Sequence, residues 1–374
     1  MTLHSSSFHR QGVRALGGAP PEPAEPLGLG DDAGLADLDA LMTRLAVGPR
    51  LSRSGQMVQE HLATGGKRVR ARLALAAGEA LGLEREALVP WAAACELLHN
   101  ATLIHDDVQD GDTMRRDQPT TWVRHGVPQA INAGDLLLML PFLAIGELRA
   151  AGDARWRLSH ALAAAAALTV RGQSLEMELL QMRRFGWEDW SRAVEGKTGA
   201  FLGLPVHGAA LLAGLDDATA VRFAREFAQL GTLFQLQDDL LDLTDRKGRG
   251  GRRGSDLAEG KVSALVVEHL ARHPADTELL VALLETPREA TAQADIDAMI
   301  DRFHLGGAVA AVKARAERIA ASVLASPLLA AVPHLHQVAS ELVASMEVSM
   351  RGVSNGGAAS ASHPHTSLLR SKLA

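Results

Sequence analysis

Helical periodicity constrains this chain more than any other feature of its sequence. Between an N-terminal segment rich in Ser, Gly and Pro and a C-terminal segment rich in Ser, Gly, Ala and His, apolar residues recur at intervals of three and four. No segment shows sustained period-two alternation. Of the 374 residues, 47% are hydrophobic, only 3% are aromatic and none is Tyr. This composition favours helices over a β-sandwich and supplies enough apolar residues for a large core. We therefore predict a single all-α helical bundle without a β-sheet.

The positions of the longer helices follow from periodic segments and their start and stop signals. We expect them at residues 69–81, from Pro90 to about Asp110, from Pro128 onward, at 154–183 and at 217–245. Gly82 should end the first of them. Pro141 should kink the third helix, and Gly172 should interrupt the fourth.

Both ends of the chain are predicted to lie outside the bundle. Residues 1–30 should form a disordered extension, and residues 352–374 a flexible tail. Residues 1–21 contain no Asp or Glu and so also fit an organelle transit peptide, but no apolar signal-peptide core follows them. We expect the helical domain to span residues 31–351.

Charge and cysteine content exclude several classes of protein. The 38 Lys and Arg residues against 44 Asp and Glu give a net charge of −6, which argues against nucleic-acid binding and a polybasic membrane anchor. Cys95 is the only cysteine, so no intrachain disulfide forms, and we expect a cytoplasmic protein. The longest charge-free apolar runs, Leu136–Ile145 and Ala161–Val170, are too short to span a bilayer, so no stable membrane insertion is expected.

Two acidic clusters share the spacing Asp-Asp-x-x-Asp. They consist of Asp106, Asp107 and Asp110, and of Asp238, Asp239 and Asp242. Each falls in the last turn of a predicted helix, where the macrodipole disfavours a carboxylate by roughly 0.3–1 kcal/mol. Two clusters of carboxylates placed in the same unfavourable position indicate a functional site. Oxygen ligands favour a hard cation, so all six are candidate ligands of Mg²⁺, with Mn²⁺ as a substitute.

Basic residues lie next to both clusters in the sequence. Arg115 and Arg116 follow the first cluster, and Lys261 follows the second, after a Gly/Arg-rich stretch at residues 248–254. Carboxylates, a hard cation and nearby Lys or Arg side chains together indicate a site for a diphosphate. The Gly/Arg-rich stretch also fits an RNA-binding segment, but it lacks aromatic residues, so a loop that covers phosphate is preferred.

The motifs together resemble those of the trans-prenyl diphosphate synthases, the enzymes that elongate isoprenyl chains head to tail. The resemblance covers roughly residues 35–350 and is carried, in the family's order, by residues 65–70 (GGKRVR), 99–110 (HNATLIHDDVQD), 115–120 (RRDQPT), 172–176 (GQSLE), 197–199 (KTG), 234–242 (FQLQDDLLD) and 254–261 (GSDLAEGK). It implies a helical bundle of the isoprenoid synthase type, similar to geranylgeranyl and polyprenyl diphosphate synthases. It also implies a homodimer.

The resemblance assigns a role to each matched residue. Asp106, Asp107, Asp110, Asp238 and Asp239 would bind Mg²⁺ that bridges an allylic diphosphate, with Asp242 completing the second motif behind them. Arg115, Lys197 and Lys261 would hold that diphosphate, while Lys67, Arg70, His99 and Arg116 would hold isopentenyl diphosphate. Thr198 and Gln235 would line the reacting carbons, and Gln173 and Glu176 would help to order the metal site. The chain departs from the family at Glu176, which is often Asp, and at Arg252, a further candidate for phosphate binding that is Lys in many members.

The function implied is the Mg²⁺-dependent condensation of isopentenyl diphosphate with an allylic diphosphate into a longer trans-polyprenyl diphosphate. Upstream of Asp106, Ala101 and Thr102 are not bulky aromatics, which favours products of twenty or more carbons, with Met139 and Phe142 as a candidate floor deeper down. A terpene cyclase is an alternative, disfavoured by the paired acidic motifs and the second diphosphate pocket. A non-catalytic subunit of a heteromeric synthase is another, disfavoured because both motifs are intact.

Overall fold

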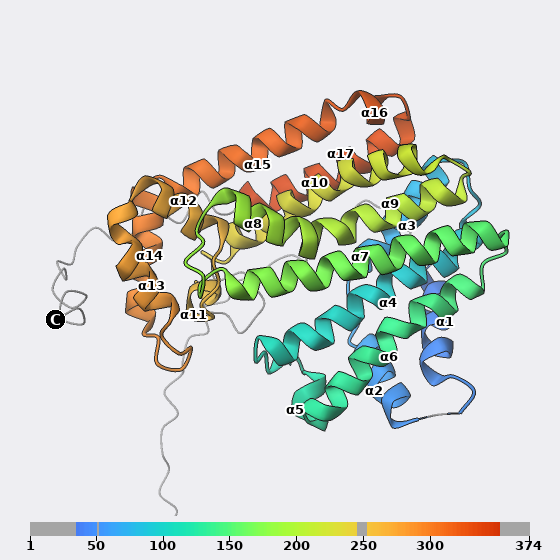
Figure 1. The fold of residues 1–374 in the computed structure, drawn as a ribbon, viewed down its shortest axis with the longest axis horizontal. Helices are drawn as coiled ribbons and strands as arrows, with labels where there is room; N and C mark the ends of the chain where they lie inside the picture. Colours follow the sequence, from blue (N-terminus) through green and yellow to red (C-terminus); the bar gives the residue numbers. More distant parts are fainter. Residues whose placement is uncertain (1–34, 51, 245–252, 352–374) are drawn as a thin grey trace, which may run out of the picture.

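The chain folds into a bundle of helices, most of which run side by side (Figure 1). The computed structural model describes residues 35–50, 52–244 and 253–351. In chain order the elements are α1 (Leu35–Val47), α2 (Arg53–Ala63), α3 (Val69–Ala80), α4 (Arg85–Gln109), β1 (Met114–Arg115), β2 (Gln118–Pro119), α5 (Thr121–His125), α6 (Val127–Gly146), α7 (Gly152–Glu178), α8 (Trp187–Val194), the π-helix η2 (Glu195–Gly199), α9 (Ala200–Leu212), α10 (Asp217–Leu241), α11 (Ser255–Ala258), α12 (Ala264–Arg272), the 3₁₀ helix η3 (Pro274–Asp276), α13 (Thr277–Leu284), α14 (Gln293–Leu305), α15 (Ala308–Leu324), α16 (Pro327–Ala330) and α17 (Pro333–Arg351). The prediction of an all-α fold is confirmed.

The predicted ends of the domain lie mostly outside the described residues. The elements run from Leu35 to Arg351, within the expected domain of residues 31–351. Residues 1–30, residues 352–374 and most of the Gly/Arg-rich stretch fall outside the described part of the chain. The division into a domain and two tails therefore stays a prediction.

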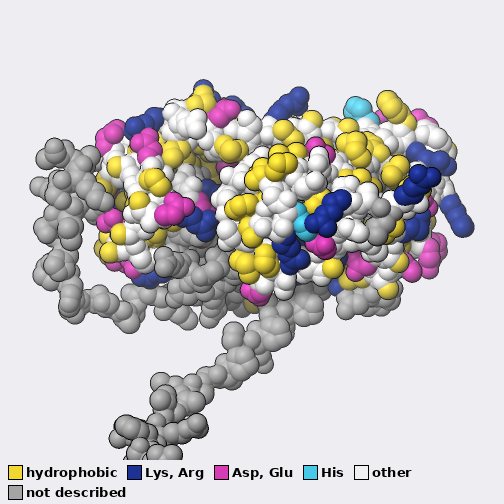
Figure 2. All heavy atoms as spheres, turned by 90° about the horizontal axis from the view of Figure 1, so that it is seen from below, with side chains coloured by type: hydrophobic (Ala, Val, Ile, Leu, Met, Phe, Trp, Pro, Cys, Tyr) yellow, Lys and Arg dark blue, Asp and Glu magenta, His cyan; other side chains and the backbone are white. Residues whose placement is uncertain are grey.

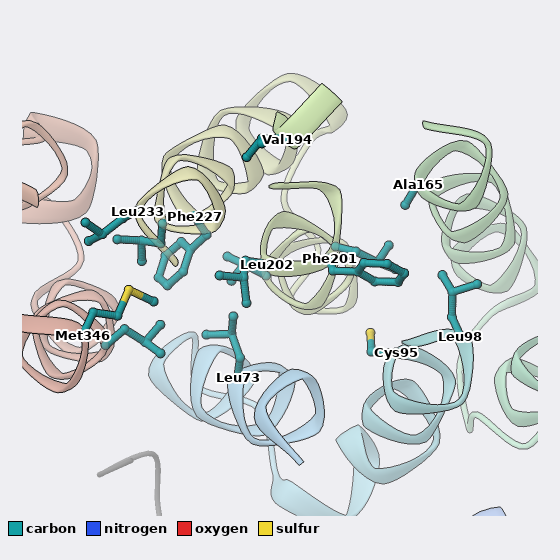
Figure 3. Packing of buried hydrophobic residues seen from close by; sticks show 14 of the residues in the cluster. Leu73, Cys95, Leu98, Ala165, Val194, Phe201, Leu202, Phe227, Leu233 and Met346 are labelled. Atoms are coloured by element: carbon teal, nitrogen blue, oxygen red, sulfur yellow. The ribbon is translucent and has the colours of Figure 1, made fainter. Parts of the chain in front are cut away.

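One hydrophobic core extends through the bundle from α1 to α17. Figure 3 shows side chains of α3, α4, α9, α10 and α17 packed together in it, among them Leu73, Cys95, Phe227 and Met346. The close approach of α9 to α4 depends on Gly208, because a Cβ there would lie 2.0 Å from the buried ring of Trp91. Tight contacts of this kind leave the helices little freedom to shift.

Several helix boundaries differ from the sequence prediction. Helix α7 ends at Glu178 rather than at residue 183, and α10 ends at Leu241 rather than at residue 245. Helix α4 begins at Arg85 rather than at Pro90, because the turn before the proline packs Leu88 fully into the core and a proline near a helix start removes only one backbone N–H. Helix α7 passes through Gly172 without interruption. This glycine serves close packing instead: a Cβ at Gly172 would lie 2.4 Å from the backbone nitrogen of Lys197.

A short antiparallel hairpin corrects the expectation that no β-sheet forms. Strands β1 and β2 pair Met114 with Pro119 and Arg115 with Gln118. Arg116 and Asp117 form the turn with φ angles of 51° and 60°, a left-handed conformation that non-glycine residues rarely adopt. Two-residue strands are too short to show an alternating pattern, which is why the sequence did not reveal them.

The helices α4 and α6 are each long and apolar enough to cross a bilayer by length and composition alone. The ten-residue apolar run at Leu136–Ile145 is only part of α6, which continues beyond it on both sides and through Pro141. The core helix of a soluble protein passes the same test, so the absence of stable membrane insertion stays a prediction. In the fold, 67% of the most apolar window of α4 is buried, as in a core helix, against 44% for α6. One side of α6 is therefore left at the surface of the chain.

Candidate active site

A cleft of about 430 Å³ lies between α3, α4, α7, η2 and α10, within the size range of small-molecule sites. Residues four apart on α4 line one wall: Leu98, Thr102, Asp106 and, at the helix end, Asp110. Asp238 of α10 also lines the cleft. The structure thus brings the two acidic motifs, which are far apart in the sequence, to one cavity.

The other three motif aspartates are buried and bound by neighbouring protein groups. Asp107 accepts a hydrogen bond of 2.8 Å from Arg115 Nε. Asp239 accepts one of 2.8 Å from Gln235 Nε2 and one of 2.7 Å from the backbone nitrogen of Ala264. Asp242, which follows the last residue of α10, accepts hydrogen bonds from the Ser255 hydroxyl and, at 3.0 Å, from the Asp256 backbone N–H. Each motif therefore has residues that face the cleft and residues that fasten its helix end.

The donors that face the cleft fit a hard divalent cation. Asp106, Asp110 and Asp238 offer carboxylate oxygens, which Mg²⁺ and Ca²⁺ prefer. Within the described residues, no three or more His, Cys, Asp or Glu side chains form a ready-made metal cluster. Mg²⁺ is commonly held by one or two carboxylates together with substrate phosphates and water. The site therefore fits a cation that binds together with a phosphate ligand.

Two lysines pair with acidic groups at this wall. Lys261 Nζ lies 3.0 Å from Asp110 Oδ2, and Lys197 Nζ donates to the carboxylate of Glu176. Burial raises the pKa of Asp106 to about 6, although Lys197 opposes the shift. Burial also lowers the pKa of Lys197, but Glu176 and Asp106 outweigh it, so that this pKa is raised overall. The ammonium group of Lys197 thus remains charged beside the acidic wall.

Lys197 and Thr198 owe their positions to the π-helical turn η2. This turn lies between Gly172 of α7 and Gly231 of α10, where added Cβ atoms would meet its backbone at 2.4 Å and 2.6 Å. The wider turn presents both side chains to the cleft, where Thr198 Oγ1 donates to Gln235 Oε1 at 3.3 Å. π-helical turns are rare and often occur at functional sites. The sequence did not predict this one, although the glycines that contact it are visible there.

A second polar region of the cleft is built around Arg70 and His99. Both side chains line the cavity, and the Nε of Arg70 and the Nδ1 of His99 are buried without a hydrogen-bond partner among the described residues. Burial, helped by Arg70 and the arginines at 115 and 116, lowers the pKa of His99 well below its ordinary value, so the ring is neutral. The Phe201 ring lies edge-on to His99, with 5.6 Å between centroids, and below the guanidinium of Arg70. A guanidinium whose Nε is buried and unused as a donor favours an anionic ligand.

The remaining predicted cations are divided between the cleft and its surroundings. Arg115 lines the cleft, while Arg116 donates to the Gly65 carbonyl and to Thr64 Oγ1, beside the glycine-rich turn that leads to Lys67. Lys67 is exposed and does not line the cleft. Arg252 lies outside the described residues.

The structural role of Arg68 in the glycine-rich turn was not predicted from the sequence. Arg68 is only 7% exposed and adopts a left-handed φ of 50° at the start of α3. It donates to the Leu62 carbonyl at 3.1 Å and lies 3.1 Å from Asp39. In the sequence it is indistinguishable from its neighbours Lys67 and Arg70, and only burial shows that it fixes the turn that carries them.

Comparisons with known proteins agree with this arrangement. The chain matches the family described as polyprenyl synthetase over residues 53–303. It is 37% identical over 210 residues to a short chain isoprenyl diphosphate synthase of Methanocaldococcus jannaschii, covering 56% of this chain and 64% of that relative, which is less than two thirds of its length. It is 34% identical over 306 residues to a geranylgeranyl diphosphate synthase of Mycobacterium tuberculosis, covering 76% of this chain and 87% of that relative.

The fold also matches solved structures. A polyprenyl synthase from Caulobacter crescentus, crystallised with calcium and isoprenyl diphosphate, superimposes with a TM-score of 0.75 at 25% identity, over 89% of this chain and 99% of that one. The bundle thus has the isoprenoid synthase fold, as the resemblance implied. The chain belongs to the polyprenyl synthetase family.

Proposed function

We propose that this protein is a prenyltransferase that joins isopentenyl diphosphate to an allylic prenyl diphosphate in the presence of Mg²⁺, a reaction of isoprenoid biosynthesis. The observation that carries the proposal is one cleft with two different polar regions. An acidic wall with two lysines suits a diphosphate bound through a cation, and the Arg70–His99 region suits a second anion without one. The names of the relatives and the diphosphate bound in the Caulobacter structure support the same assignment.

We assign the allylic diphosphate to the acidic wall. Asp106, Asp110 and Asp238 would hold Mg²⁺, which would neutralise the diphosphate and make it a better leaving group. Lys197, Lys261 and Arg115 border the same wall and would bind the remaining phosphate oxygens. Asp107, Asp239 and Asp242 would act by fixing the helix ends, since each already accepts a hydrogen bond from a protein donor.

We assign isopentenyl diphosphate to Arg70 and His99, with Arg116 and Lys67 at the edge. Arg70 and His99 are half-buried at the cleft, and the Nε of Arg70 and the Nδ1 of His99, which lack partners among the described residues, would find them in the diphosphate oxygens. No carboxylate lies among these four residues, so the second diphosphate would be bound by protein cations and a neutral imidazole without a hard divalent cation.

The reaction follows from this placement. The allylic C–O bond breaks, the double bond of isopentenyl diphosphate attacks the resulting carbocation, and the proton lost from the new chain passes to the released diphosphate. The chain's own contribution is to orient the two substrates and to stabilise the departing charge with Lys197, Lys261 and Arg115. The oxygens of Thr198 and Gln235, which lie within 3.3 Å of each other at the cleft, would face the positive carbon.

The product should have twenty or more carbons. The row on α4 that leads away from Asp106 ends in Thr102 and Leu98, and neither is a bulky aromatic. Met139 and Phe142, the expected floor, do not line the cleft and are 57% and 37% exposed, so that expectation is wrong for this structure. Leu138, the neighbouring residue on α6, does line it and is the better candidate for a floor.

We also propose that the protein is a cytoplasmic homodimer. Large apolar side chains are exposed along one side of α6, namely Val127, Ile131, Met139, Phe142 and Leu143. Apolar side chains also stand among charged ones on the face of the chain seen in Figure 2. An exposed apolar surface of this extent is typical of a contact between subunits. The cytoplasmic location rests on the single buried cysteine, Cys95.

Replacing a metal-facing aspartate tests the function. In Asp106→Ala and Asp238→Ala, turnover with Mg²⁺, isopentenyl diphosphate and an allylic starter should fall by about a hundredfold or more, because the leaving group loses its electrostatic support. Asp301→Ala, an exposed aspartate of α14, is the control and should keep wild-type turnover. Incorporation of labelled isopentenyl diphosphate at a normal rate by either cleft variant, or none by the wild type, would contradict the proposal.

Opening the apolar end of the cleft tests the product length. Leu138→Ala should shift the product mass to longer chains, since the side chain that lines the cavity becomes smaller. Leu305→Ala makes the same change at a position that is 90% exposed and should leave the products unchanged. Mass spectrometry of the products measures both. An unaltered distribution in Leu138→Ala would exclude this residue as the floor.

The pKa of Asp106 predicts a pH dependence of metal binding. Its pKa is raised to about 6, so the carboxylate is charged above that pH and becomes protonated below it. Binding of Mg²⁺ with inorganic diphosphate should weaken by up to about tenfold per pH unit below pH 6, because a proton must first leave. Calorimetry in buffers of different ionisation enthalpy should detect this proton at pH 6 for the wild type. Asp106→Asn should not release it, and equal proton release by both proteins would refute the assignment.

The oligomeric state provides a further test. Sedimentation should give twice the mass of one 39.6 kDa chain. Ile131→Glu, which places a charge in the exposed row on α6, should shift the protein towards the mass of a single chain. A wild-type protein that sediments as one chain at micromolar concentration would contradict the dimer.

A further inference from the structure

Five charged side chains of alternating sign link the segments that follow the two acidic motifs. Arg288 Nη1 lies 3.4 Å from Asp112 Oδ1, and its Nη2 lies 3.4 Å from Glu259 Oε1. Glu259 Oε2 lies 2.7 Å from Lys261 Nζ, which lies 3.0 Å from Asp110 Oδ2. Asp110 and Asp112, at the two ends of this row of ion pairs, are two residues apart in the sequence, so the backbone joins the ends. We call these five residues the charge ring.

The members of the ring differ in their exposure to solvent. The side chains of Glu259 and Asp112 are 4% and 7% exposed, while those of Lys261 and Arg288 are 22% and 41% exposed. A carboxylate buried as deeply as that of Glu259 is costly unless a cation compensates it. Two cations lie at ion-pair distance from it without donating a hydrogen bond: Lys261 approaches from the cleft, and Arg288 from the outside of the molecule.

The backbone holds most of the ring in place. The Asp112 carbonyl accepts hydrogen bonds from Thr120 Oγ1 at 2.9 Å and Trp122 Nε1 at 2.8 Å. The backbone nitrogen of Lys261 donates to the Asp256 carbonyl at 2.9 Å. A cavity of about 390 Å³ lies beside the ring and shares Asp110 and Lys261 with the cleft. The long side chain of Lys261 therefore has space to move while its backbone stays fixed.

We propose that Glu259 and Arg288 are positioning residues for Lys261. They allow this lysine to leave its ion pair with Asp110 and to bind the allylic diphosphate. The inference rests on the proposed function. When Asp110 becomes a metal ligand, Lys261 loses one of its carboxylate partners and turns to the phosphate oxygens. The ion pair with Glu259 keeps the ammonium group of Lys261 at the cleft wall. Arg288 balances the charge of Glu259, so that this carboxylate does not hold the lysine back.

Removing the outer cation tests the inference. In Arg288→Met, Glu259 is compensated by Lys261 alone, which should bind the diphosphate less well. We expect the KM for the allylic substrate and the Kd of inorganic diphosphate with Mg²⁺ to rise by about tenfold. The KM for isopentenyl diphosphate should stay within about twofold, since the Arg70–His99 region lies outside the ring.

A second arginine supplies a matched control. Arg183 also lies near two carboxylates, at 3.5 Å from Glu278 and 3.8 Å from Glu285, but on the surface. Arg183→Met should leave both KM values and the diphosphate Kd unchanged. A purely structural role of Arg288 would instead lower the Tm and the fraction of active protein without changing either KM, and that outcome would overturn the inference.

A double-mutant cycle isolates the coupling within the ring. In Glu259→Gln, Lys261 is drawn to Asp110, and the Mg²⁺ concentration needed for half-saturation with inorganic diphosphate should rise. In Glu259→Gln combined with Arg288→Met, the uncompensated carboxylate is gone, so the loss in diphosphate affinity should be smaller than the product of the two single losses. Independent effects would overturn the inference. Calorimetry with diphosphate needs no turnover, so it gives a result even if the wild-type protein fails to elongate prenyl chains.

Discussion

Carboxylates at the ends of α4 and α10 lie in a field of unfavourable sign, and the rest of the site depends on how that conflict is resolved. Asp110 and Asp242 directly follow the last residues of these helices, where the macrodipole disfavours negative charge. Three of the six motif aspartates, Asp107, Asp239 and Asp242, accept hydrogen bonds from protein donors, which compensate their charge. The charge of the other three is left to Lys197, Lys261 and any cation that enters the cleft. Ligand binding thus completes an electrostatic arrangement that folding leaves incomplete.

This division requires rigid helix positions, and small residues provide them. The π-helical turn that carries Lys197 and Thr198 is held between Gly172 and Gly231, where a Cβ on either side would collide with backbone atoms. A backbone so closely packed cannot shift without opening a void or creating a clash. The backbone of Lys197 is therefore fixed, and under the proposed function its side chain would turn from Glu176 to the diphosphate.

The helical fold and the helix-end positions of the two acidic motifs could be predicted from the sequence, because both depend on local rules. The meeting of the two motifs at one site is not local and was implied by the family resemblance. Helical periodicity and stop signals located α3, where φ at Gly82 is 83°, and placed the motifs at helix ends. Spacing along one helix, however, cannot show which of two adjacent aspartates faces a cavity: Asp106 does, whereas Asp107 binds Arg115. Nor does the sequence show that Gly172 packs against a neighbouring turn and does not interrupt its helix. The orientation of the aspartates and the packing of Gly172 both depend on neighbouring elements that lie elsewhere in the sequence.

The two anion sites also differ in their cost to the unliganded protein. Arg70 is desolvated, which lowers its pKa, and its Nε has no hydrogen-bond partner among the described residues. Lys197 and Lys261 are paired with Glu176 and Asp110. The first site therefore carries an unmet hydrogen-bond donor that an anion would satisfy directly, whereas at the second an anion must displace existing ion pairs. A cation that binds Asp110 would free Lys261 from its ion pair with this residue. Under the proposed function, the acidic wall would therefore need metal to bind its diphosphate, and the Arg70–His99 region would bind an anion without it.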